Sequence, residues 1–184
     1  MFRALFSKKE TFVAEEIMEW TGSDISHSAI EWYDDLSSHV MESNARGVNI
    51  QTAQRWEGEE DGNILVRSYE ITGIEEGALA QTWDEVFDKW GNKPYGYMQL
   101  FGDASMIWVD DKLGRRFAKL WARFIKRFLG YRRTVVCSEL VWYFLSELDE
   151  LRPLFRHLDP ERVEPDQLEE VMKANPQYFK PVGG

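Results

Sequence analysis

The sequence predicts an α+β fold in which helices pack on an antiparallel sheet. Two loosely alternating runs flank the turn residues Asp34 and Asp35, which is typical of a β-hairpin and therefore of antiparallel pairing. A later alternating run predicts another long strand, and apolar residues recur at helical spacing in several segments. The predicted strands cover residues 25–32, 38–43 and 63–71. The predicted helices cover residues 8–20, 75–90, 113–129 and a segment that begins at Cys137.

The N-terminal helix is predicted from its capping residues. Ser7 is suited to the N-cap position, and Glu10 follows three residues later, as in a capping box. The apolar residues between Phe12 and Trp20 then share one side of the helix. Residues 21–24 end this helix before the hairpin begins.

The segments that follow the hairpin are predicted from turn residues and periodicity. Residues 44–47 form a turn, residues 48–50 are short and extended, and residues 51–56 favour a helical turn. The acidic loop 57–62 leads to the strand 63–71. Further segments are the stop at 91–94, the stretch 95–101 that suits either a helix or a strand, and a proline-initiated last helix within 161–171.

Composition limits the class of protein. At 43% hydrophobic and 14% aromatic content, residues 1–184 can bury the core of a single domain. The single cysteine excludes an intramolecular disulfide framework and a metal cage of thiolates, and no cofactor is expected. We find no apolar run long enough for a signal peptide or a membrane span, so we expect a cytoplasmic protein without a transmembrane segment.

The formal net charge of −10 conceals a basic stripe between Lys112 and Arg133, which has nine basic residues and no acidic ones. The acidic remainder should repel nucleic acid, so general nucleic-acid binding is not expected. One interpretation of the stripe is a solvated face opposite an apolar side that packs into the core. The other is contact with an anionic membrane surface or an acidic polymer. The residues available for that contact are Arg115, Arg116, Lys119, Arg123, Lys126 and Arg127.

The only cysteine, Cys137, lies where the β-branched run 134–136 ends and a helix begins. Free backbone N–H groups and the positive end of the helix dipole stabilise a thiolate there and can bind an oxyanion. Glu139 is predicted to be a helix-start carboxylate that the same dipole stabilises. The position therefore suits a thiol nucleophile, although free cysteines are more often buried residues that fill space.

Two earlier residues are suited to activate such a thiol. His27 is at the start of a predicted strand, and Glu42 is in the neighbouring run. A cysteine nucleophile needs a base, and the base needs an acceptor that fixes its tautomer. His39 is the alternative third member, but residues 39 and 42 point to opposite faces of a regular strand. Only one of the two can therefore face His27.

The order and flanks of these pieces resemble the permuted papain-like amidases of YiiX/YaeF type, circularly permuted relatives of the NlpC-type cell-wall peptidases. The resemblance rests on a Ser-His-x-Ala-Ile strand from Ser26, a Val-x-Glu-Ser strand from Val40 and a late Cys-Ser-Glu-Leu-Val helix from Cys137. It extends to the aromatic run from Lys93 and the closing helix from Arg162, and so covers about residues 9–171. One departure is that the predicted N-terminal helix replaces the strand with which the family usually opens.

The resemblance implies a single permuted papain-like domain that acts as a thiol hydrolase through an acyl-enzyme. Cys137 would be the nucleophile, His27 the general base and Glu42 the orienting residue. The Cys137 backbone N–H would supply part of the oxyanion hole, and Tyr95 would border the substrate groove. The implied substrate is an amide or ester, either a peptide of the peptidoglycan kind or an acyl-lipid.

Other classes of function stay open at this point. A catalytically inactive papain-like module could dock on a partner through the basic amphipathic helix 112–133, and a purely structural protein would have an inert Cys137. Zinc bound by His27, His39, Cys137 and a carboxylate is chemically reasonable, because these ligand types suit the metal. Their spacing matches no known zinc signature, so we expect no metal.

Overall fold

The computed structural model describes residues 1–9, 14–15, 18–19, 22–33, 36–58, 62–94 and 135–182 of the chain. The strands in these ranges are β1 (Phe2–Lys9), β2 (His27–Tyr33), β3 (Ser38–Asn44), β4 (Gly47–Thr52), β5 (Asn63–Ile71) and β6 (Phe179–Val182). The helices with described bounds are α2 (Ala53–Glu57), α3 (Glu76–Trp90), α6 (Cys137–Glu147), α7 (Arg152–Phe155) and α8 (Pro165–Ala174).

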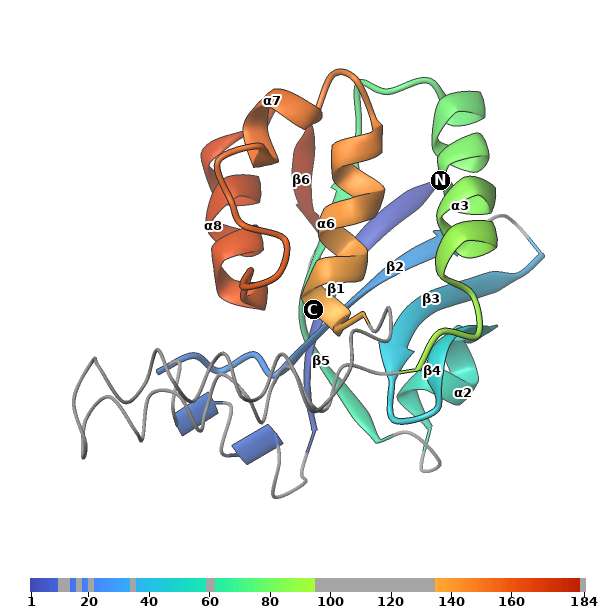
Figure 1. Ribbon diagram of the computed structural model, residues 1–184, viewed down its shortest axis with the longest axis vertical. Coiled ribbons are helices and arrows are strands. Elements are labelled where there is room, and N and C mark those ends of the chain that lie inside the picture. Colours follow the sequence, from blue (N-terminus) through green and yellow to red (C-terminus); the bar gives the residue numbers. More distant parts are fainter. Residues whose placement is uncertain are drawn as a thin grey trace, which may run out of the picture.

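The strands form one six-stranded sheet in the order β4-β3-β2-β1-β5-β6, and every neighbouring pair is antiparallel. In Figure 1, α6 crosses the sheet with α3 on one side of it and α7 and α8 on the other. The α+β class with an antiparallel sheet and packed helices is therefore confirmed.

The two faces of the sheet differ in what covers them. Ala4, Ile30 and Met41 belong to the large apolar core that α3, α6, α7 and α8 share, and we call this side the front face. Their sequence neighbours Leu5, Ala29 and Val40 form a small cluster with Trp56 of α2, on the rear face. Successive side chains of a strand point to opposite faces, so the alternation of these residues assigns each cluster to its own side.

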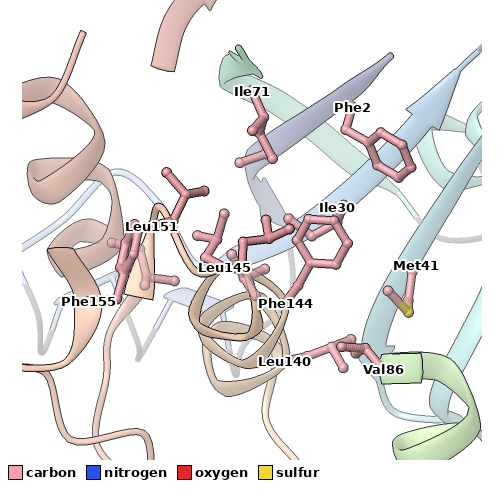
Figure 2. Close-up of a cluster of buried hydrophobic side chains, with 14 of the residues drawn as sticks. Phe2, Ile30, Met41, Ile71, Val86, Leu140, Phe144, Leu145, Leu151 and Phe155 are labelled. Atoms are coloured by element: carbon pink, nitrogen blue, oxygen red, sulfur yellow. The ribbon is translucent and has the colours of Figure 1, made fainter. Parts of the chain in front are cut away.

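Helix α6 is fixed to the front face by its apolar residues. Figure 2 shows Leu140, Phe144 and Leu145 directed toward side chains of the strands and of α3, among them Ile30 and Met41. Full burial of such a side chain stabilises the fold by about 1.5–3 kcal/mol. The first residue of α6 is Cys137, so this packing determines where the thiol lies.

The predicted helix at residues 8–20 is wrong at its start. Ser7 is not an N-cap, because it lies in β1 together with Lys8 and Lys9. The central strand β1 pairs with β2 on one side and with β5 on the other, and it buries residues on both of its faces. Its apolar residues therefore do not alternate simply with polar ones. Residues 14–15 and 18–19 are helical, and the rest of the predicted helix lies outside the described residues.

Most other predicted elements have their counterparts in the structure. The hairpin is β2 and β3, the strand 63–71 is β5, and the helix 75–90 is α3, which begins one residue later. The short extended piece and helical turn are β4 and α2, and the proline-initiated helix is α8. Helix α7 and strand β6 have no counterpart in the predictions.

Lys93, after α3, and Val135, before α6, are both hydrogen-bonded to one pair of residues in β3 and β4. The Val48 N–H donates to Lys93 O at 3.0 Å, and the Ser43 hydroxyl donates to Val135 O at 2.6 Å. Ser43 and Val48 are directly paired across β3 and β4. Gly47 permits this approach because its φ is +99° and a Cβ there would lie 2.4 Å from Lys93 O.

Candidate active site

Cys137, the first residue of α6, lies against the part of β2 that extends beyond its pairing with β3. The pairing of these strands runs from Tyr33 and Ser38 to Ile30 and Met41, while β2 continues to His27. The Cys137 sulfur accepts hydrogen bonds from the backbone N–H groups of Ser28 in β2 and of Ser138 in α6. One of these main-chain donors belongs to β2 and the other to the first turn of α6, and a thiolate is the form that such donors favour.

The His27 imidazole connects Cys137 to Glu42. Its Nε2 lies 2.6 Å from Glu42 Oε2, and its ring also makes a hydrogen bond with the Cys137 side chain. Because Nε2 faces the carboxylate, Nδ1 is the ring nitrogen left for the sulfur. All three residues are buried. The structure thus brings together the three residues that the sequence singled out, in the order thiol, imidazole and carboxylate.

Four donors surround the buried Glu42 carboxylate. Oε2 accepts from His27 and from Trp56 Nε1, the latter at 3.1 Å, while Oε1 accepts from Asn44 Nδ2 and from Gln51 Nε2. Burial by itself would raise the pKa of Glu42. The hydrogen bond and positive charge of His27, the nearby Lys9 and the Asn44 amide outweigh burial, so the pKa is lowered and Glu42 stays ionised.

The pKa values of the base and the nucleophile move in opposite directions. Burial works to lower the pKa of His27, but the Cys137 thiolate and the Glu42 carboxylate overcome it and raise the pKa to about 9. Burial works to raise the pKa of Cys137, but the His27 charge and the two backbone donors lower it. The site therefore favours a thiolate and an imidazolium as an ion pair at neutral pH.

Glu42, and not His39, takes the third position of the site. His39 lies in β3, as Glu42 does, and is paired with Trp32 of β2 and Thr52 of β4. It is three residues from Glu42, so regular alternation points its side chain to the other face. Two predicted features lie outside the described residues, namely Tyr95 and the basic helix 112–133 with its Arg and Lys side chains.

Glu139 lies in the first turn of α6, as predicted, but its pKa is raised and not lowered. The carboxylate is buried, and burial is the largest of the influences that raise its pKa to about 7. The charges of Glu161 and Asp159 act in the same direction, whereas the Val136 N–H and the Tyr143 hydroxyl oppose the rise. Glu139 still caps the first turn, because its Oε2 accepts from the Val136 N–H at 3.4 Å.

The sequence did not single out the donors that surround Glu42. Asn44 is two residues along β3, and Gln51 is paired with Val40, so both share the face of Glu42. Counting the strand register from the turn at residues 44–47 would have predicted that Asn44 and Gln51 lie on the face of Glu42. Trp56 reaches Glu42 from α2, and no periodicity of the sequence indicates that contact.

Within the described ranges, no three or more His, Cys, Asp and Glu side chains are grouped in a way that could hold a metal ion. Among the helices of the same ranges, none is long and apolar enough to cross a membrane. No protein-family model matches the chain, and no curated protein matches its sequence. The geometry of Cys137, His27 and Glu42 is accordingly the main guide to function.

Proposed function

We propose that this protein is a cysteine hydrolase with a permuted papain-like fold, which cleaves an amide or an ester through an acyl-enzyme. The observation that carries the proposal is the buried series Cys137, His27 and Glu42, in which the pKa of the thiol is lowered and that of the imidazole is raised. A cysteine that only fills space in a core has no need of a buried imidazole and carboxylate behind it.

The order of the elements supports the permuted fold. The His27 strand comes early, and the helix that begins with Cys137 comes late and packs on an antiparallel sheet. The resembling family usually opens with a strand before the histidine segment. Strand β1 occupies that place, so the departure expected from the N-terminal helix is removed.

In the proposed acylation step, the Cys137 thiolate attacks the carbonyl carbon of the substrate and forms a carbon–sulfur bond. The carbonyl oxygen becomes an oxyanion, for which the Cys137 backbone N–H at the start of α6 is the proposed donor. The His27 imidazolium gives its proton to the leaving amine or alkoxide as the bond to it breaks. The products are a thioester on Cys137 and a neutral imidazole.

Deacylation reverses these roles. Neutral His27 takes a proton from a water molecule, and the oxygen of that water attacks the thioester carbonyl. The carbon–sulfur bond breaks, the carboxylic acid leaves, and the thiolate and imidazolium form again. Glu42 orients the ring and stabilises its charge in both steps, as the carboxylate of a catalytic triad does. The resemblance suggests cell-wall peptide amides or acyl-lipids as the substrates.

Alkylation tests this proposal without a known substrate. Cys137 is the only cysteine, so the mass gained from iodoacetamide reports on one site. We expect rapid modification even at about pH 6, because a thiolate is already present there. In His27→Ala the main stabilising charge is lost, so the pH at which alkylation accelerates should rise part of the way toward that of a free thiol.

The matched control is His157→Ala, which removes an exposed histidine outside the series Cys137, His27 and Glu42 and should leave the alkylation profile unchanged. A parent protein that reacts only near pH 8.5 or above, as an ordinary thiol of about that pKa does, would contradict the proposal. The same result, with no difference in His27→Ala, would favour the non-catalytic binding module instead.

A further inference from the structure

A series of hydrogen bonds on the rear face leads from Glu42 back to the strand residue beside His27. The Trp56 indole N–H donates to Glu42 Oε2, and the Trp56 carbonyl accepts from Asn63 Nδ2 at 3.0 Å. Asn63 Oδ1 in turn accepts from the Ser7 hydroxyl at 3.2 Å. Ser7 is the register partner of His27 across β1 and β2. We call Ser7, Asn63, Trp56, Glu42 and His27 the rear-face network.

Within the rear-face network, Trp56 links Glu42 to Asn63. Its side chain is fully buried, and its N–H and its carbonyl are both hydrogen-bonded. It belongs to the short helix α2 on the rear face, where it packs with Leu5, Ala29 and Val40. Trp56 is therefore placed to act on the chemistry through Glu42, from the side of the sheet opposite the core that holds α6.

The indole N–H binds the oxygen on which the orientation of His27 depends. Glu42 Oε2 receives both the His27 Nε2 contact and the Trp56 donor, while Oε1 is held by Asn44 and Gln51. With donors on both oxygens, rotation of the carboxylate would break bonds at each end. Without the indole N–H, His27 would be the remaining donor to Glu42 Oε2. The His27 imidazole would then lose an acceptor that is fixed in place.

We propose that Trp56 is a positioning residue for the proposed hydrolysis, which it serves by fixing Glu42 Oε2 against His27. This inference rests on the proposed function. A role in packing alone would need only an apolar ring of similar size, since Leu5, Ala29 and Val40 offer no hydrogen bond to match. The donor function and the packing function of Trp56 are therefore separable by substitution.

The test uses p-nitrophenyl acetate as an activated ester probe and the full chain. Trp56→Phe keeps an aromatic ring in the cluster and removes the donor, whereas Leu5→Ala weakens the same cluster and leaves the donor in place. We expect Trp56→Phe to lower kcat about 10-fold with KM nearly unchanged, as for loss of one hydrogen bond to a charged group. Leu5→Ala should lower Tm while kcat stays within about 2-fold.

A second pair of variants covers the case in which Trp56→Phe does not fold. Gln51→Leu removes a donor from Oε1 at a half-buried position, and Gln54→Leu makes the same change at an exposed position of α2. We expect Gln51→Leu to lower kcat several-fold and Gln54→Leu to leave it unchanged. This result would show that the donors around Glu42, of which Trp56 is one, govern kcat. It does not require that Trp56→Phe folds.

The outcomes separate the two proposals. If the parent shows no turnover that depends on Cys137, the proposed function fails and takes this inference with it. If the parent turns over, but Trp56→Phe and Leu5→Ala lose kcat equally or not at all, Trp56 is only a packing residue and the inference alone fails. Where Trp56→Phe is unfolded, a Gln51→Leu rate equal to that of Gln54→Leu overturns it.

Discussion

Two buried glutamates flank the candidate site and carry charge in opposite ways. Glu42 is 0% exposed and has a lowered pKa, whereas Glu139 is 5% exposed and has a pKa raised to about 7. Burial alone would give the more deeply buried Glu42 the higher value. Glu42 has four donors, one of them a charged imidazole, while Glu139 has the Val136 N–H and the Tyr143 hydroxyl and lies near two other carboxylates.

The difference teaches that donors and neighbouring charges, more than depth, determine the charge of a buried carboxyl group in this protein. The two residues also differ in their place relative to the thiol. Glu42 acts on the far side of His27, whereas Glu139 caps Val136, the residue that precedes Cys137. The proposed hydrolysis needs a permanent anion at the first position, whereas the second position needs only an acceptor for a backbone N–H.

The largest effect is expected at Glu42. Glu42→Gln should lower kcat for p-nitrophenyl acetate by roughly 10²–10⁴-fold, as for loss of the carboxylate of a catalytic triad. The fold should persist at reduced stability, because the new NH₂ group faces two of the four donors, and each unsatisfied buried donor costs about 1–3 kcal/mol. Glu31→Gln changes another buried carboxylate of the sheet, bound by Ser38, and is the matched control. Equal loss of kcat in both variants would contradict a specific role for Glu42.

The next effect concerns the charge of His27. The chain has three histidines, so their ring signals can be followed separately by NMR as the pH is raised. We expect one of them, His27, to titrate near the value of about 9. Cys137→Ser removes the thiolate, the largest influence that raises this pKa, and should move the titration clearly lower.

The raised pKa of His27 beside Cys137 should also make the free energy of unfolding depend on pH. The folded pKa of His27 lies above its ordinary 6.5, so its contribution is complete below about 6.5 and is lost as the pH rises toward 9. Cys137→Ser should reduce that loss. A parent in which all three histidines titrate near the ordinary value of about 6.5 would show that no ion pair exists.

The smallest effect is expected at Glu139. Its folded pKa is raised from 4.5 to about 7, so the folded state loses stability as the pH rises through that window. Glu139→Gln keeps an acceptor for the Val136 N–H and removes the charge. At pH values above about 7 we expect it to stabilise the fold by about 1 kcal/mol, or roughly 2–4 °C in Tm.

Below the ordinary pKa of 4.5, Glu139 is protonated in both states and the gain in Tm should disappear. Glu170→Gln on the exposed side of α8 is a suitable control for the general loss of one negative charge. A Tm difference between Glu139→Gln and the parent that does not change with pH would mean that Glu139 is ionised in the fold, like Glu42.

Sequence patterns found the strands whose two faces differ and missed the one with both faces buried. Strand β5 has an alternating sequence with a loop on each side, and its bounds match the predicted residues 63–71. Strand β1 has neighbours on both sides and buries Ala4, Leu5 and Phe6 in succession, so its apolar run carries no period of two. The choice of Ser7 as an N-cap then placed the start of a helix at residues that pair in β1 instead.

The same limit applies to the site. Cys137, His27 and Glu42 could be selected because each chemical role requires a particular residue type, and the order of their segments resembles a known family. The hydrogen bond from Trp56 and the charges of Asp159 and Glu161 near Glu139 depend on how separate elements pack. Tertiary contacts of this kind leave no period or motif in the chain, so sequence reasoning could not supply them.

The paired residues Ser43 and Val48 join two parts of the chain that are far apart in the sequence. Lys93 and Val135 are both hydrogen-bonded to this pair, so the two ends of any chain between them are already brought together. Because Val135 lies two residues before Cys137, the hydrogen bond from the Ser43 hydroxyl ties the start of α6 to β3.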